Sequence, residues 1–180
     1  MKKFVMMLFI PFLLVGCGGK MMNTPTKKVE MFFANYQTLD DSVIKQLNDV
    51  ANEEELFNST QRKEYVDLMK KHYQDLKYEI KDEIVDGDTA TVTVEIEVKD
   101  YSKTLKDAET YLNEHKEEFN NDKNEYDESL FTSYRLEQLK KSTDKVKYTL
   151  NIYLTKVDNE WKMDDLSETD RMKINGMYEY

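Results

Sequence analysis

The side chains that carry most enzyme chemistry are scarce in this chain of 180 residues, which has one Cys, two His and five Gly. A single Cys forms neither an internal disulfide nor a Cys-based zinc site. Because Gly16, Gly18 and Gly19 lie within the first twenty residues, the other two glycines cannot build a phosphate-binding loop or a dinucleotide fingerprint. No G-x-S-x-G nucleophile elbow is present. We therefore expect no catalytic residue, no cofactor and no metal site.

The two histidines, His72 and His115, are the remaining candidates for acid–base or metal chemistry. Each lies on the apolar side of a segment with helical periodicity. A partly buried, hydrogen-bonded imidazole is the ordinary outcome at such a position, and no H-E-x-x-H spacing joins the two. We expect both side chains to pack in the core.

The acidic segments were also tested as cation sites. From Asn120 to Phe131, oxygen-bearing side chains occupy positions 1, 3 and 5 of a calcium loop. Position 6 is Glu125 where an EF-hand has Gly, and position 12 is Phe131 where it has a bidentate Glu. The segment therefore fails as an EF-hand. We interpret Glu53-Glu54-Glu55 and Asp164-Asp165 as solvated charge.

The first sixteen residues have the pattern of a secretory signal. Lys2 and Lys3 precede an apolar run from Phe4 to Val15, which small residues follow. Twelve apolar residues in a helix cover about 18 Å, well short of the ~30 Å hydrocarbon core of a bilayer. This segment is therefore not expected to be a permanent transmembrane helix.

The sequence Leu14-Val15-Gly16-Cys17 resembles the lipobox of bacterial lipoproteins. The resemblance implies diacylglycerol transfer to the Cys17 sulfur, cleavage between Gly16 and Cys17, and palmitate-type acylation of the new N-terminus. Two acyl chains anchor a protein stably, whereas one binds only marginally. The alternative is an ordinary secretory signal with a chance Cys. We expect residues 1–16 to be a lipoprotein signal peptide and 17–24 a lipidated tether. The protein would then lie on the extracytoplasmic face of the cell membrane of a Gram-positive bacterium.

Three helices are expected to follow the tether. Thr24-Pro25 supplies a hydroxyl N-cap and then Pro at the first helical position. Asp40 or Asp41 is expected to cap the second helix. The segment Asn58-Ser59-Thr60 interrupts the pattern before a third helix that runs to about Asp75. The mature chain therefore begins with helices.

The apolar period then changes from 3.6 to 2, which predicts antiparallel strands. Asp86-Gly87 is a turn signal, and Ala90 to Val98 alternates without a break, as a half-buried strand does. A second alternating run covers Val146 to Leu154. Asp158-Asn159 predicts a turn that leads from this run to a short last strand, which contains Trp161. Between the two long strands, residues 101–143 are expected to form a helical hairpin whose acidic arm faces a basic arm.

This layout resembles the cystatin-like, nuclear transport factor 2-like domain of bacterial lipoproteins, many of which have no assigned activity. The segments that carry the resemblance are Pro25–Tyr36, Thr89–Val98, Val146–Leu154 and Asn159–Leu166. The resemblance implies one α+β domain over residues 25–180. In it, N-terminal helices pack on a curved antiparallel sheet, and residues 101–143 are a helical insertion.

Aromatic residues are expected at the inner positions of this cone. In such a fold the helices lie over a concave sheet and can leave a pocket, which aromatic side chains with polar tips suit. The alternative is a closed core. The candidate pocket residues are Phe33, Tyr36, Tyr73, Tyr148 and Trp161. No acid is expected on the inner face, because Glu95 and Glu97 lie opposite the valines.

These observations favour a non-enzymatic binding domain. The expected partners are the membrane, through lipid at Cys17, and a protein or envelope component. The insertion 101–143 and the tail Met172–Tyr180 are the candidate contact surfaces. A formal net charge of −10 argues against nucleic acid, because phosphate contacts need a basic face. The alternative is a small-ligand-binding lipoprotein that uses the aromatic pocket, and an enzyme is the third possibility.

Overall fold

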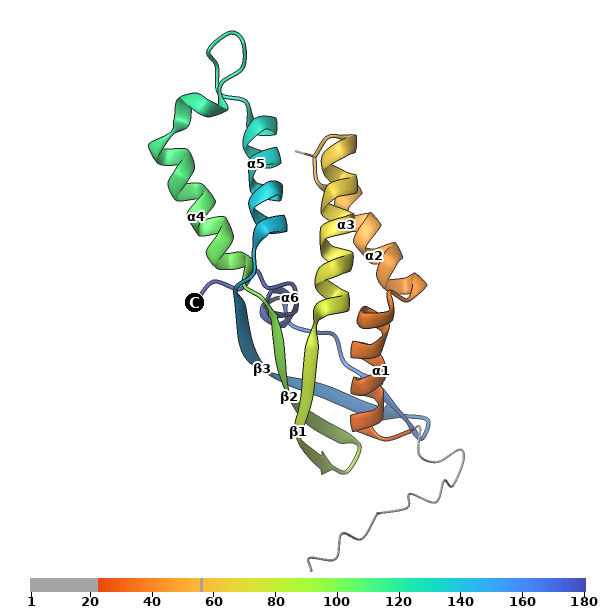
Figure 1. Cartoon of the computed structure of the whole chain (residues 1–180). Coiled ribbons are helices and arrows are strands. Elements are labelled where there is room, and N and C mark those ends of the chain that lie inside the picture. Colours follow the sequence, from red (N-terminus) through yellow and green to blue (C-terminus); the bar gives the residue numbers. More distant parts are fainter. Residues whose placement is uncertain (1–22, 56) are drawn as a thin grey trace, which may run out of the picture.

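The computed structural model describes residues 23–55 and 57–180. In this part of the chain, six α-helices, one short 3-10 helix and an open four-stranded antiparallel sheet form an α+β fold (Figure 1). The elements are α1 (Pro25–Thr38), α2 (Asp41–Glu53), α3 (Ser59–Asp75), β1 (Lys77–Asp86), β2 (Thr89–Lys99), α4 (Tyr101–Glu114), the 3-10 helix η1 (Lys116–Phe119), α5 (Glu128–Lys141), β3 (Lys145–Val157), β4 (Glu160–Met163) and α6 (Glu168–Ile174).

The predicted signal peptide, its cleavage site at Gly16 and the lipidation site Cys17 lie outside the described residues. Among the residues that are described, no helix is both long enough and apolar enough to cross a membrane.

Side-chain caps begin the three N-terminal helices where the sequence predicts them. The Thr24 hydroxyl accepts a hydrogen bond from the backbone N–H of Lys27 at 3.2 Å, and Pro25 follows it. Asp40 caps α2. Asn58 caps α3 in a capping box with Gln61, in which each side chain bonds the backbone of the other residue.

The sheet has the order β1-β2-β3-β4, and each strand is antiparallel to its neighbour. Gly87 adopts φ +60° in the β1–β2 turn, and both Asp158 and Asn159 have positive φ in the β3–β4 turn, as two-residue hairpins require. Alternate residues of β2 from Ala90 to Val98 are buried, so one face of the sheet is covered. This confirms the predicted half-buried strands.

Helix α1 lies against the buried face of the sheet (Figure 1). Phe33 is fully buried, and its ring stacks on Tyr78 of β1 with ring centroids 4.9 Å apart. Contacts at the start of α1 hold both edges of the sheet. The amide of Asn23 bonds the Asn159 carbonyl at 2.7 Å, and Thr26 donates to the Glu83 carboxylate at 2.7 and 2.8 Å.

The insertion between β2 and β3 is helical, as predicted, and α4 packs against α5 with a break between them. The two arms enclose an aromatic cluster that includes Phe119, Phe131 and Tyr134. Among the described residues, Arg135 of α5 pairs with Glu109 of α4 at 4.0 Å, and Lys103 of α4 pairs with Asp144 just after α5. Aromatic packing rather than charge therefore holds the hairpin together.

The two histidines have different environments. His72 is buried, as predicted, and its Nε2 lies 2.8 Å from the Ile174 carbonyl oxygen. Core packing of His115 is a wrong prediction, because its side chain is 42% exposed. His115 is the C-cap of α4, where the chain leaves the helix, and its ring stacks on Tyr111 with centroids 4.2 Å apart.

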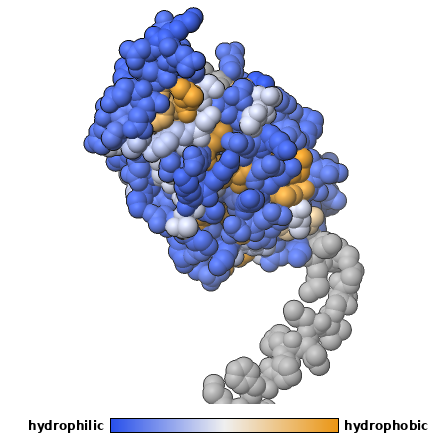
Figure 2. Space-filling model, turned by 45° about the horizontal axis from the view of Figure 1, so that its top comes forward, coloured by the Kyte–Doolittle hydropathy of each residue, from blue (hydrophilic) through white to orange (hydrophobic). Residues whose placement is uncertain are grey.

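The C-terminal tail packs on the domain. The Tyr148 hydroxyl donates to the Tyr178 carbonyl at 3.3 Å, and the Tyr180 hydroxyl donates to Asp100 Oδ2 at 2.8 Å. The tail is therefore held across the start of α4 and β3 by these two bonds, while the Tyr180 side chain stays 80% exposed. Figure 2 shows a largely hydrophilic face that a few separated apolar patches interrupt.

Candidate functional site

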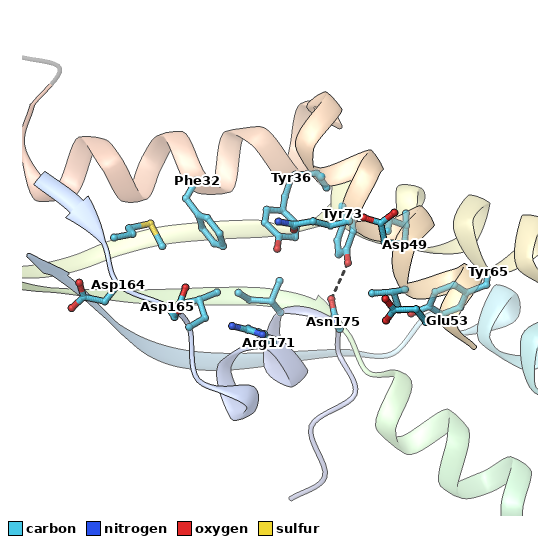
Figure 3. Close-up of a pocket in the computed structure, with 17 residues that line it drawn as sticks. Phe32, Tyr36, Asp49, Glu53, Tyr65, Tyr73, Asp164, Asp165, Arg171 and Asn175 are labelled. Atoms are coloured by element: carbon cyan, nitrogen blue, oxygen red, sulfur yellow. Dashed lines mark hydrogen bonds between the residues drawn. The ribbon is translucent and has the colours of Figure 1, made fainter. Parts of the chain in front are cut away.

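A cavity of about 580 Å³ lies between the N-terminal helices and the C-terminal segment (Figure 3). Its walls come from α1, α2 and α3 on one side, and from the end of β4, the β4–α6 connection and α6 on the other. The lining residues are Phe32, Tyr36, Val43, Gln46, Leu47, Asp49, Val50, Glu53, Tyr65, Tyr73, Met163, Asp164, Asp165, Leu166, Arg171, Ile174 and Asn175.

Helical spacing in α1 creates the aromatic wall. Phe32 and Tyr36 are four residues apart and share one face of the helix, while Phe33 points toward the sheet. The Phe32 and Tyr36 rings have centroids 5.0 Å apart, and Tyr73 of α3 meets Tyr36 edge-on at 4.8 Å. Tyr65 extends this wall from α3. The cavity therefore has a continuous aromatic side.

The opposite wall is tied to α3 at the end of α6. The Tyr73 hydroxyl donates to Asn175 Oδ1 at 3.0 Å (Figure 3), and His72 bonds the Ile174 carbonyl one residue earlier. Burial is the main reason that the pKa values of Tyr36, Tyr65 and Tyr73 lie above that of a free phenol. The hydroxyls are therefore neutral donors at pH 7.

Five charged side chains reach the cavity. Asp49 and Glu53 come from α2, Asp164 and Asp165 from the β4–α6 connection, and Arg171 from α6. Figure 3 shows the α2 pair toward one end, Asp164 and Asp165 toward the other, and Arg171 on the same wall as Asp165. The charge of the lining is therefore strongly negative, with one cation among four carboxylates.

The five charged side chains differ in whether another group of the protein already forms an ion pair or a hydrogen bond with them. Asp49 forms an ion pair with Lys45 at 2.5 Å, and Asp164 accepts a hydrogen bond from the Thr155 hydroxyl at 3.3 Å. Within residues 23–55 and 57–180, no oppositely charged group lies within 4 Å of Glu53, Asp165 or Arg171. Three charges at the cavity are thus available to a ligand.

The cavity contains two of the five residues predicted for a pocket. Tyr36 and Tyr73 line it. Phe33, Tyr148 and Trp161 do not: Phe33 fills the space between α1 and the sheet, Tyr148 packs under Tyr178, and the Trp161 side chain is buried. Phe33 therefore fills the contact of α1 with β1, and the open space lies between the N-terminal helices and the C-terminal segment.

Sequence reasoning missed the charged part of the site. Glu53 and Asp164-Asp165 were interpreted as solvated charge, and all three are exposed, yet each borders the cavity. Only the α2 acids could have been linked to a site from the sequence, because Asp49 and Glu53 are separated by helical spacing and lie close to Val50. Their relation to Arg171 depends on tertiary packing between segments more than 100 residues apart.

Within the described part of the chain, no cluster of three or more His, Cys, Asp or Glu side chains is arranged to hold a metal ion. Comparison with protein-family models, with curated proteins and with solved structures finds no match for this chain. The case for function therefore depends on the cavity itself.

Proposed function

We propose that this protein is a lipid-anchored, extracytoplasmic binding protein whose cavity holds a small ligand without transforming it. The observation that carries the proposal is the open cavity of about 580 Å³ with an aromatic wall and three unpaired charges. Ligand sites commonly have volumes of about 300–1,000 Å³, apolar walls and a few polar groups that orient the ligand. The cavity has all three properties.

The cavity, rather than the tail, favours a small ligand over a docked protein partner. The tail is engaged through Tyr148 and Asp100. The α4–α5 hairpin remains a candidate surface for a protein or envelope component. It lies at the opposite end of the molecule from the start of α1 (Figure 1), and so it would point away from an anchored N-terminus.

The cystatin-like fold and the anchor are parts of the same proposal. A helix across one face of an open antiparallel sheet supports the cystatin-like assignment, and the helical insertion is a departure from it. The sequence Leu14-Val15-Gly16-Cys17 supports the anchor. Replacing Cys17 with Ala should move the protein from the membrane fraction to the soluble fraction. Unchanged fractionation would contradict the anchor and leave the cavity proposal standing.

Native mass spectrometry tests the cavity. The full chain is purified from membranes in mild detergent as wild type, as Val50→Trp and as Val157→Trp. Val50 is 53% exposed and lines the cavity, so an indole there fills space without entering the core. Val157 is 40% exposed at the end of β3 and is the matched control.

We expect wild type and Val157→Trp to carry the same additional small mass and Val50→Trp to lack it. A mass that persists in Val50→Trp would show that the ligand binds elsewhere. Absence of a bound mass from all three proteins, before and after incubation with an extract of the producing cells, would refute a ligand-binding role.

A further inference from the structure

The unpaired charges of the cavity define the chemical class of its ligand. We infer, on the basis of the proposed function, that the cavity binds a zwitterionic amino acid with a second cation at the far end of an apolar stem, as in lysine. Among the five charged side chains of the cavity, Glu53, Asp165 and Arg171 are the three for which the described residues supply neither an ion pair nor a side-chain hydrogen bond, whereas Asp49 pairs with Lys45 and Asp164 accepts from the Thr155 hydroxyl.

Asp165 and Arg171 are matched to the zwitterionic end. They lie on the same wall, formed by the β4–α6 connection and α6 (Figure 3). A guanidinium binds a carboxylate through two parallel hydrogen bonds, and a carboxylate beside it accepts from an ammonium group. An α-amino acid presents both charges on one carbon, so this pair of side chains suits it.

Glu53 is matched to the second cation. It lies on α2, toward the end of the cavity opposite Asp165 (Figure 3). Asp49 stands one helical turn earlier and already pairs with Lys45. The free carboxylate at this end of the cavity therefore has no protein cation to neutralise it, and a remote ammonium group would supply one.

The wall between the two ends suits a hydrocarbon stem. Phe32, Tyr36 and Tyr73 lie along the cavity from one end toward the other (Figure 3). Methylene groups pack well against aromatic rings, and amphipathic side chains such as Lys bury their stems in this way. The phenol hydroxyls stay neutral, so this wall adds no charge.

Other ligand classes leave charges unmatched. A linear diamine satisfies both carboxylate ends but brings no carboxylate for Arg171. A dicarboxylate faces four carboxylates and one guanidinium. An apolar amino acid satisfies Asp165 and Arg171 but leaves Glu53 unused. The three-charge match therefore selects a basic amino acid, free or at the end of a short peptide.

Calorimetric titration of the full chain in detergent tests this with three probes of similar length. L-Lysine has all three charges, norleucine lacks the remote cation, and 1,5-diaminopentane lacks the carboxylate. We expect lysine to bind about fivefold more tightly than either of the other two, since an exposed charge contact contributes at most about a factor of five.

Variants assign each charge to its partner. Glu53→Gln should weaken lysine about fivefold and leave norleucine unchanged, while Arg171→Gln should weaken lysine and leave 1,5-diaminopentane unchanged. Glu117→Gln and Lys106→Gln remove exposed charges of the α4–α5 hairpin, outside the cavity, and should change nothing. Dilysine distinguishes the two sources: tighter binding than lysine assigns a peptide, and weaker binding a free amino acid.

The inference would be overturned if the three probes bound with equal affinity, or if Glu53→Gln lowered the affinity of all three equally. If lysine fails to bind while native mass spectrometry detects another mass that Val50→Trp removes, the ligand class is wrong and the binding function stands. If neither experiment detects a ligand, both proposals fail.

Discussion

The hydroxyl of Tyr73 donates a hydrogen bond to Oδ1 of Asn175, 102 residues later, at 3.0 Å. This bond joins the C-terminal end of α3 to the residue that ends α6, so it connects the two walls of the cavity. Beside it, His72 bonds the Ile174 carbonyl. The position of α6, and with it that of Arg171, depends on these two contacts at one end of a short helix.

Removing the Tyr73 hydroxyl should loosen the C-terminal wall. We expect Tyr73→Phe to lower the free energy of unfolding by about 1 kcal/mol, the usual net value of such a bond. Tyr65→Phe is the control, because Tyr65 also lines the cavity and no hydrogen bond from its hydroxyl is found among the described residues. Urea denaturation measures both, and equal losses would contradict a specific role for the Tyr73–Asn175 bond.

The buried His72 should make stability depend on pH. Burial is the main cause that lowers its pKa from 6.5 to about 4; Lys99 lowers it further, while the bond to Ile174 and the charge of Asp75 oppose this shift. The folded state therefore keeps His72 neutral while the unfolded chain takes up a proton below pH 6.5. The contribution of His72 to the free energy of unfolding is therefore fully present above pH 6.5. It falls by about 3 kcal/mol as the pH decreases to 4.

Denaturation of His72→Gln between pH 7 and pH 4 checks this effect. The variant should be less stable than wild type at pH 7 and should lose less stability on acidification. His115→Gln is the control for the loss of a histidine side chain outside the core. A wild-type slope in His72→Gln would show that other groups cause the acid sensitivity.

Gly176 should not tolerate a side chain. Its φ is +69°, and a Cβ there would lie 2.1 Å from the Lys99 carbonyl oxygen and 3.1 Å from Cε1 of His72. We expect Gly176→Ala to cost about 3 kcal/mol, since it combines left-handed strain with a backbone clash. Gly87→Ala is the matched control: its φ is +60° with open space around it, so it should cost only about 1 kcal/mol. Thermal unfolding would contradict this reasoning if both variants lost the same stability.

Gln61 should hold the helical insertion against α3. Its side-chain amide is buried and donates to the Ser129 carbonyl at 2.8 Å and to the Ser133 hydroxyl at 3.0 Å, while its oxygen accepts from the Asn58 N–H. Gln61→Leu removes these bonds and leaves the Asn58 N–H without its capping partner, so it should cost about 2 kcal/mol.

Hydrogen exchange should locate that loss in α5. The exposed Gln74→Leu, also on α3, is the control and should leave both stability and exchange unchanged. Wild-type protection of α5 in Gln61→Leu would mean that the aromatic cluster alone positions the hairpin.

Local rules predicted most of the secondary structure. Thr24, Asp40 and Asn58 cap helices because a side chain near the helix start meets an unpaired N–H, which depends on neighbouring residues alone. The alternation in β2 identifies its buried face in the same way. His115 was misplaced because periodicity does not say where a helix ends.

The candidate site was less predictable because no local rule describes it. Tyr36 and Tyr73 were identified as inner aromatics, but the same argument also selected Phe33 and Trp161, which the core absorbs. One helical position separates Phe32 from Phe33, and that difference decides which ring faces the cavity. The unpaired charges matter only because α6 lies across the cavity from α2, an arrangement that depends on the tertiary fold.

The contacts at the start of α1 determine how the domain carries mechanical load. The Asn23 amide nitrogen donates to the Asn159 carbonyl in the β3–β4 turn, and its amide oxygen accepts from the Trp161 N–H of β4. Thr26 donates to Glu83 in β1. A force applied through the chain ahead of residue 23 is therefore transmitted first to the two edges of the sheet. The first turn of α1 does not have to bear it alone, and the aromatic wall that begins at Phe32 is shielded from tension.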